Sequence, residues 1–163
     1  MLKRRRATLK DVAESVGVHV STVSRALNPE TRHLITSDIV RKIAAASRAL
    51  GYIPNTAAYS LRTTRTKIVG VVVPDITNSI FPPIIRGVED ALLEHGYATV
   101  LVNTDGGMER EAAMIEALAA RGVDGLVIAS VHRDDGRIRD LATQGTPVIT
   151  VNRRMDDPTI PSV

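Results

Sequence analysis

The stretch that decides the fold is residues 17–28, Gly17-Val18-His19-Val20-Ser21-Thr22-Val23-Ser24-Arg25-Ala26-Leu27-Asn28. On a helix that begins at Val20, the apolar Val23, Ala26 and Leu27 fall on one side at i, i+3 and i+4 spacing. The other side is short and polar and carries a single Arg. Such a face suits a helix in the DNA major groove, where small hydroxyls permit close approach and a guanidinium bonds guanine bidentately. An ordinary surface helix is the alternative that this segment alone leaves open.

A first helix is predicted immediately before this stretch. Thr8 and Asp11 have the spacing of a capping box, which places a helix at residues 9–16. Its apolar face consists of Leu9, Val12, Ala13 and Val16. Gly17 ends the helix, since it supplies the positive φ of a tight turn at a helix C-terminus. Two helices joined by so short a link with a glycine are typical of a helix-turn-helix.

A third helix is predicted after a polar loop at residues 30–35. Thr36 is its expected N-cap, Asp38 lies in its first turn, and Gly51 stops it. Its apolar stripe is Ile39, Ile43, Ala46 and Leu50. Residues 54–55 then mark a break, and the segment 56–61 is too short to form a stable helix by itself. DNA or a twin subunit could supply its partner, and residues 62–66 have the composition of a linker.

The distribution of charge separates the chain into two parts. Residues 1–66 hold 12 Lys or Arg against 4 Asp or Glu, a balance of +8, whereas residues 67–163 hold 9 against 14, a balance of −5. A basic first part is typical of a nucleic-acid-binding unit, and residues 3–6 form a basic arm that can contact phosphates. A solvated basic face without a partner is the alternative.

Composition excludes several classes of protein. The chain has no cysteine, which removes disulfides, thiolate zinc sites and cysteine nucleophiles. No apolar run approaches the length of a membrane span, and no apolar region follows the basic residues 3–6 as a signal peptide requires. We therefore expect a cytoplasmic protein without a membrane partner.

From residue 67 onward, strands and helices alternate. Strands are predicted at residues 68–73, 98–102, 125–129 and 147–151, and helices at 83–95, 108–121 and 136–143. This order indicates a doubly wound parallel α/β sheet. Residues 160–163 have the pattern of a further strand, so we expect an unfinished domain that exposes the apolar face of its sheet and self-associates or folds poorly.

With both parts considered, the chain resembles the LacI family of bacterial transcription repressors from Thr8 to Val163. The matching motifs are residues 8–13, 20–25, 50–55, 60–62, 70–75 and 123–126. The resemblance implies a helix-turn-helix headpiece at residues 1–53, a hinge helix and linker at 54–66, and part of a periplasmic-binding-protein-like effector domain at 67–163. It also implies a sequence-specific repressor that binds a pseudo-palindromic operator as a homodimer. The small-molecule effector that controls it would be a sugar or sugar derivative.

The resemblance also implies which residues contact DNA. The base-reading positions are Val20, Ser21 and Arg25, and the positions near phosphates are Thr8, Thr22, Ser24 and Asn28. Hinge contacts come from Asn55 and Ala58, and Leu61 is the residue inserted between base pairs, which kinks the duplex. His19 stands where the family usually has a Ser that caps the helix. Because His caps less well, we expect either that the turn at Val18 compensates or that the ring touches phosphate.

The expected effector cleft lies at the carboxyl ends of the parallel strands, where open α/β sheets bind ligands. Its residues are Asn78, Ile80 and Phe81 after the first strand, and Asn152 and Arg153 after the fourth. By resemblance, Asn152 and Arg153 bond ligand hydroxyls and Phe81 forms an apolar platform. The family often has Asp in place of Asn152, so no known sugar preference carries over. The other wall of the cleft is expected beyond Val163.

We find no catalytic constellation in the sequence and expect neither an enzyme nor a cofactor. His132 with Asp134 and Asp135 could be drawn as a metal site, but the spacing of further ligands is missing and a solvated loop is the better interpretation. Two alternatives compete with the repressor. A solute-binding protein would share the α/β part without the basic headpiece, and an α/β enzyme would need a catalytic set.

Overall fold

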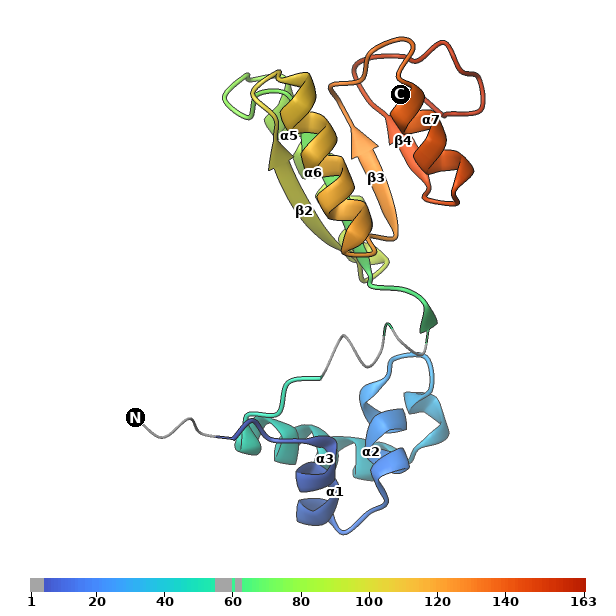
Figure 1. Cartoon of the computed structure of the whole chain (residues 1–163). Helices are drawn as coiled ribbons and strands as arrows, with labels where there is room; N and C mark the ends of the chain where they lie inside the picture. The colour runs from blue at the N-terminus through green and yellow to red at the C-terminus, as the bar shows by residue number, and fades with distance from the viewer. Residues whose placement is uncertain (1–4, 55–59, 61–62) are drawn as a thin grey trace. The chain divides into compact units, whose positions relative to one another are not determined.

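The computed structural model describes residues 5–54, 60 and 63–163, and the chain divides into two compact units, Met1–Thr56 and Ala57–Val163. The first unit is helical and the second contains a parallel sheet (Figure 1). The division at residue 56 falls within the segment expected to be the hinge. Among the described residues, no helix combines the length and apolarity needed to cross a membrane.

Three helices and one 3₁₀ turn form the first unit. They are α1 (Leu9–Val16), α2 (Val20–Leu27), η1 (Arg32–Leu34) and α3 (Ser37–Leu50). The bounds of α1 and the start of α2 are those predicted from the sequence, whereas η1 was not predicted. The buried core of the unit consists of Val12, Ala13, Val23, Ala26 and Ile43. All three helices thus contribute to one small apolar core, which fixes α2 on α1 and α3.

The ends of these helices follow local chemistry. The Thr8 N–H and hydroxyl donate to the Asp11 carboxylate at 2.7 and 2.8 Å, and the Asp11 N–H donates back to the Thr8 hydroxyl at 3.3 Å. Gly17 and Gly51 have φ of 71° and 63°, so both helix ends use the left-handed conformation that glycine adopts without strain.

The predicted N-cap and first turn of α3 are confirmed, whereas the predicted place of Leu50 in its apolar stripe was wrong. Thr36 occupies the N-cap position, but its side chain makes no capping hydrogen bond. Asp38 instead supports the first turn by pairing with Lys42 at 2.9 Å. Leu50 is 43% exposed and lies outside the core, because the unit is too small to cover the last turn of the helix.

The second unit alternates strands and helices as predicted. Its elements are β1 (Ile68–Val73), α5 (Phe81–Glu94), β2 (Ala98–Asn103), α6 (Met108–Ala120), β3 (Gly125–Ile128), α7 (Gly136–Thr143) and β4 (Val148–Thr150). The sheet has the order β2-β1-β3-β4 and every pair is parallel, with Val71 opposite Leu101 on one side and Val127 on the other. Ser162 forms a parallel bridge with Thr150, as the strand-like pattern of residues 160–163 suggested.

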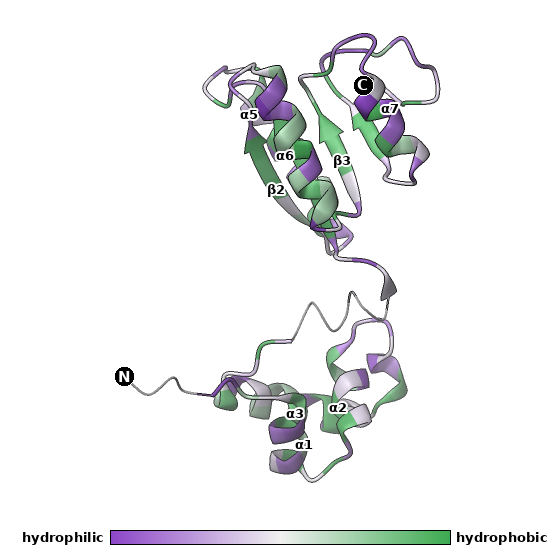
Figure 2. Cartoon of the chain, viewed as in Figure 1, coloured by the Kyte–Doolittle hydropathy of each residue, from purple (hydrophilic) through white to green (hydrophobic). Residues whose placement is uncertain are grey.

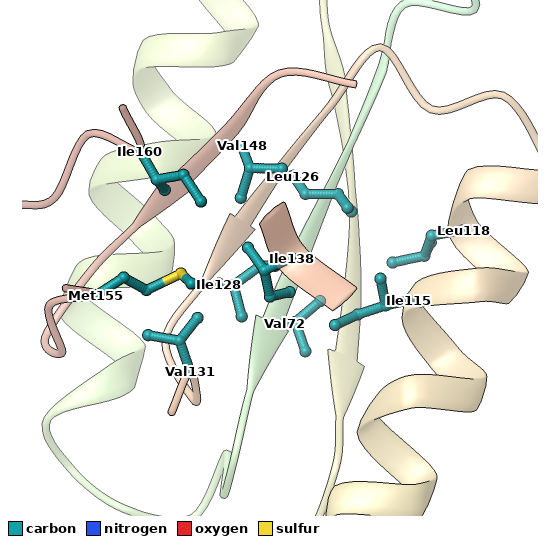
Figure 3. Packing of buried hydrophobic residues seen from close by; sticks show 10 residues of the cluster. All are labelled: Val72, Ile115, Leu118, Leu126, Ile128, Val131, Ile138, Val148, Met155 and Ile160. Atoms are coloured by element: carbon teal, nitrogen blue, oxygen red, sulfur yellow. The ribbon is translucent and has the colours of Figure 1, made fainter. Parts of the chain in front are cut away.

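Helices cover both faces of the sheet, which confirms the doubly wound architecture. On one face, α6 and α7 pack Ile115, Leu118 and Ile138 against Val72, Leu126, Ile128 and Val148 of the strands (Figure 3). On the other face, α5 packs on a second cluster, whose buried members are Val69, Val71, Val73, Phe81, Val127, Ala129 and Val151. Alternate residues of β1 therefore serve opposite faces of the sheet.

The start of β1 is anchored to the turn before β3. The Asp124 carboxylate accepts hydrogen bonds from the Thr66 N–H at 2.7 Å, the Thr66 hydroxyl at 2.9 Å and the Lys67 N–H at 3.1 Å. The Thr66 hydroxyl also lies 2.8 Å from the Gly122 carbonyl. Residues 66 and 67, expected as the end of a linker and the start of the domain, are thus held by a single carboxylate.

One further expectation for this unit needs correction. Helix α5 begins at Phe81 rather than at Pro83, because Pro82 and Pro83 occupy first-turn positions where a missing N–H costs nothing. The central strands are covered on both faces, whereas the edge strand β2 is largely exposed and carries the exposed Val100 and Leu101. The expectation that this apolar surface makes the chain self-associate stays a prediction. Large apolar side chains are exposed on the edge strand β2 and on α5 and α6, namely Leu93, Val100, Leu101, Met108 and Met114. Figure 2 shows the apolar character of β2.

Candidate functional site

The polar face of α2 stands on a buried apolar face. Val23 and Ala26 are buried in the core, whereas Ser21 and Arg25 are exposed. Val20, expected to read bases, is half-buried and packs partly against the core cluster. Ser21 and Arg25 are therefore accessible to a partner from solvent, whereas Val20 is accessible only in part.

Arg25 carries an available guanidinium. In the part of the chain that the structure describes, its side chain makes no ion pair. Its backbone carbonyl accepts from the Thr31 hydroxyl at 3.1 Å and from the Asn28 N–H at 3.3 Å, so the end of α2 is fixed to the following loop. An unpaired guanidinium on a fixed helix can bond a base edge without first breaking an ion pair.

His19 caps α2 with its own ring. Its Nδ1 lies 3.3 Å from the Ser21 backbone nitrogen and 2.8 Å from the Ser21 Oγ. His19 has φ −70° and ψ 148°, the extended conformation of an N-cap. Neither the turn at Val18 nor a contact between the ring and a phosphate is needed to compensate for the missing Ser. The ring itself supplies the acceptor that a Ser hydroxyl would supply.

The backbone and side chains at the N-terminus of α1 hydrogen-bond to one another. The Thr8 hydroxyl donates its proton to Asp11. It therefore cannot donate to a DNA phosphate at the same time, because a phosphate oxygen only accepts hydrogen bonds. Hydrogen bonds from the Thr8 N–H and hydroxyl, followed by the charge of Arg5, lower the pKa of Asp11 below its ordinary 3.8. Arg5 pairs with Asp11 at 2.7 Å, which ties one residue of the basic arm to α1.

The remaining expected DNA contacts are divided between described and undescribed residues. Thr22, Ser24 and Asn28 are half-buried on α2 or at its end. The Asn28 Oδ1 accepts from the Glu30 N–H at 3.0 Å, which leaves the amide NH₂ of Asn28 as a donor. Asn55, Ala58 and Leu61 lie outside the described residues, as does most of the expected hinge helix.

A hollow lies at the carboxyl ends of β3 and β4. It has a volume of about 730 Å³ and is lined by Val131, His132, Arg133, Asn152, Arg153, Arg154, Met155, Asp156 and Pro158. The structure thus brings the expected Asn152 and Arg153 together with the basic His132, Arg133 and Arg154, which sequence reasoning missed. Their positions directly after the third and fourth strands were the available signal. Within the described part of the chain, Arg133, Arg153 and Arg154 make no ion pair, so their guanidinium groups can donate to a polar ligand.

The residues expected from the first strand behave differently. Asn78 and Ile80 are exposed after β1, where the Asn78 Oδ1 accepts from the Ile80 N–H at 3.1 Å, but neither lines this hollow. Phe81 is only 2% exposed and belongs to the core under α5. The expectation that Phe81 forms a ligand platform was wrong, because its ring is needed to pack the start of α5 on the sheet.

The acidic loop after β3 has a structural use. Asp135 is the N-cap of α7 and accepts from the Arg137 N–H at 3.1 Å, while the Arg137 guanidinium pairs with the same carboxylate. Asp134 pairs with Arg139 at 2.8 Å. These contacts support the interpretation of the segment as a loop that starts a helix.

Comparison with known proteins gives the same two-part division. Residues 8–55 match the model of bacterial regulatory proteins, lacI family, and residues 66–163 match that of periplasmic binding proteins and the sugar binding domain of the LacI family. The transcriptional regulator RegA of Clostridium saccharobutylicum is 36% identical, over 96% of this chain and 46% of its own length. KdgR of Bacillus subtilis is 37% identical, over 92% of this chain and 44% of its own length.

A solved structure with the same arrangement is the lac repressor dimer bound to operator and the anti-inducer ONPF. It matches with a TM-score of 0.78 and 28% identity, over 97% of this chain and 48% of that one. A helix-turn-helix unit followed by a periplasmic-binding-protein-like unit defines the class of ligand-controlled bacterial regulators. The chain belongs to the LacI family. It spans about half the length of the relatives it matches, which are regulators and not enzymes.

Proposed function

We propose that the protein is a sequence-specific DNA-binding repressor whose affinity for its operator is controlled by a small-molecule effector. The observation that carries the proposal is the exposed polar face of α2, which holds Ser21 and Arg25 above the buried Val23 and Ala26. The Arg25 side chain makes no ion pair with any residue that the structure describes. In helix-turn-helix proteins the second helix lies in the major groove and its N-terminal residues contact base edges. The lac repressor structure, which is bound to operator, shares the fold of this chain.

The charge of the chain supports DNA as the partner. The first 66 residues carry a balance of +8, while the remainder carries −5. Phosphate neutralisation supplies most of the sequence-independent affinity of such proteins and makes it fall with salt. We therefore assign non-specific affinity to the basic residues of the first unit and sequence choice to α2.

We place the effector in the hollow at the carboxyl ends of β3 and β4. Asn152 and the guanidinium groups of Arg133, Arg153 and Arg154 offer several hydrogen-bond donors there. Donors of this kind suit the hydroxyls and acidic groups of a sugar or sugar derivative. Asn78 and Ile80 remain candidates for a second contact at the edge of β1.

We propose a homodimer as the form that binds a pseudo-palindromic operator. Exposed Leu93 of α5, Val100 and Leu101 of β2, and Met108 and Met114 of α6 supply apolar surface outside the core. Burial of such surface against a second copy is favourable, and two-fold symmetry matches two half-sites one helical turn apart.

The test is selection of DNA sites from a random pool by the chain, followed by titration at several salt concentrations. Arg25→Ala should cost roughly 1–3 kcal/mol on the selected site and relax the choice of base at one position of each half-site. Arg48→Ala is the matched control, because it removes the same charge from the exposed surface of α3. It should weaken binding to all sequences by a similar, small factor. Equal losses on all sequences for Arg25→Ala would refute its assignment as a base reader.

A further inference from the structure

The N-cap of α2 contains an arrangement that the helix-turn-helix itself does not require. The His19 Nδ1 lies 2.8 Å from the Ser21 Oγ, in addition to its 3.3 Å contact with the Ser21 backbone nitrogen. Both residues are exposed, and Ser21 lies on the surface that the proposed function turns toward DNA. The capping residue therefore contacts the side chain of a base-reading residue.

The positions of the hydrogens follow from this network. A backbone N–H can only donate, so the Nδ1 that it meets must carry a lone pair and not a proton. The neutral ring then has its proton on Nε2. The hydroxyl of Ser21, at the shorter distance, must donate its one proton to the same Nδ1. A serine that has donated its proton offers only lone pairs to other groups.

A fixed hydroxyl direction has a consequence for base recognition. A free serine both donates and accepts, so it discriminates poorly between base edges. An acceptor bonds the exocyclic amine of adenine or cytosine in the major groove. It finds no partner in the acceptors of guanine (N7 and O6) or thymine (O4).

We propose that His19 is a specificity-determining residue that fixes Ser21 as a hydrogen-bond acceptor and so selects adenine or cytosine at the base Ser21 faces. The inference rests on the proposed function, since it requires α2 to read DNA. His19 acts here through Ser21 as a positioning residue. The Nε2–H of the exposed ring remains a donor suited to a phosphate, which contributes affinity without sequence choice.

The test compares three variants of the chain on operators that carry each of the four bases at every position. His19→Asn keeps an acceptor, Oδ1, at the place of Nδ1 and is itself a strong N-cap, but it lacks Nε2. His19→Ser keeps a cap whose hydroxyl both donates and accepts, so it does not fix the direction of the Ser21 hydrogen bond. Ser21→Ala removes the hydroxyl and identifies the base that this residue faces.

We expect the unmodified chain to prefer adenine or cytosine at that base by roughly 3- to 10-fold, the range of one net hydrogen bond. His19→Asn should keep this preference while weakening binding to every sequence. His19→Ser and Ser21→Ala should lose it, with the choice at the base read by Arg25 unchanged. A His19→Ser variant with the full preference, or a preference for guanine or thymine in the unmodified chain, would overturn the proposal.

An NMR measurement tests the geometry without DNA. Long-range ¹H–¹⁵N spectra of the imidazole rings distinguish the two neutral tautomers from each other and from the imidazolium form. His19 should be protonated at Nε2, and a ring protonated at Nδ1 would overturn the proposal. A chain that shows this tautomer but selects no DNA sequence would refute the proposed function, and with it the base preference, while leaving the cap geometry in place.

Discussion

Gly70 lies in β1, on the face of the sheet that packs against Leu118 of α6. A Cβ at this position would lie 2.7 Å from Leu118 Cδ1 and 2.7 Å from Leu126 Cδ2. Both leucines belong to the core under α6, where they are 5% and 1% exposed. We therefore predict that Gly70→Ala destabilises the second unit.

The size of the effect follows from two opposing contributions. Apolar carbons pack at roughly 3.5–4.0 Å, so the two leucine methyls would each have to move by about 1 Å within a packed core. Overpacking of this kind costs about 1–3 kcal/mol. Replacing a strand glycine returns about 0.5–1 kcal/mol of backbone entropy. The difference is a net expected loss of about 0–2.5 kcal/mol, centred near 1 kcal/mol, in the free energy of unfolding.

Gly87→Ala is the matched control. Gly87 is an exposed residue in the interior of α5, where an added Cβ meets nothing within 4 Å. The same substitution there should raise stability by about 0.5–1 kcal/mol, because alanine is the better helix former. The same substitution is thus expected to lower the free energy of unfolding at Gly70 and to raise it at Gly87.

Urea unfolding followed through amide NMR signals measures both variants. Signals of β1 report the second unit, and signals of α1 report the first unit, whose midpoint should not move. A double variant, Gly70→Ala with Leu118→Ala, should lose at least about 0.5 kcal/mol less than the sum of the single losses, since the shortened side chain makes room for the new methyl. A β1 midpoint that rises in Gly70→Ala, or losses that simply add, would refute the reasoning.

Three further predictions concern the helix cap, the first core and the strand anchor. Because the pKa of Asp11 is lowered in the folded chain, ionised Asp11 stabilises the first unit above pH 3.8 and loses this effect as the pH falls through the lowered value. The difference in the melting temperature of α1 between the unmodified chain and Asp11→Asn should therefore disappear in that acidic range. A difference that persists there would contradict the assignment. Val23→Ala, at a fully buried site, should cost about 1.5–3 kcal/mol in the first unit and lower DNA affinity without changing base preference. Asp124→Ala removes the acceptor of three hydrogen bonds and should cost the second unit about 2–3 kcal/mol by urea titration, against a smaller loss for Thr66→Ala.

The sequence predicted those parts of the fold that depend on neighbouring residues. The capping box of Thr8 and Asp11 and the glycine turn at Gly17 fix α1 and the start of α2 through contacts within a few residues. The β-branched run of β1 likewise has one reasonable interpretation, a strand buried on both faces. Elements whose state depends on distant packing were missed, such as the exposure of Leu50 and the burial of Phe81.

The candidate site was predicted unevenly for the same reason. The exposed positions of Ser21 and Arg25 follow from helix periodicity alone. The cap made by His19 does not, because it depends on the rotation of an imidazole ring that no sequence pattern encodes. Arg133 and Arg154 became visible only when the sheet order placed the ends of β3 and β4 next to each other.

The Asp124 anchor bears on allosteric communication. One carboxylate holds two consecutive backbone N–H groups, so residues 66 and 67 must move together with the turn that precedes β3. The turn that contains Asp124 lies at the amino end of β3. The hollow proposed for the effector lies at the carboxyl end of β3, roughly 13 Å away for a strand of this length. A rotation of β3 caused by a ligand would therefore displace Thr66 as part of one rigid body.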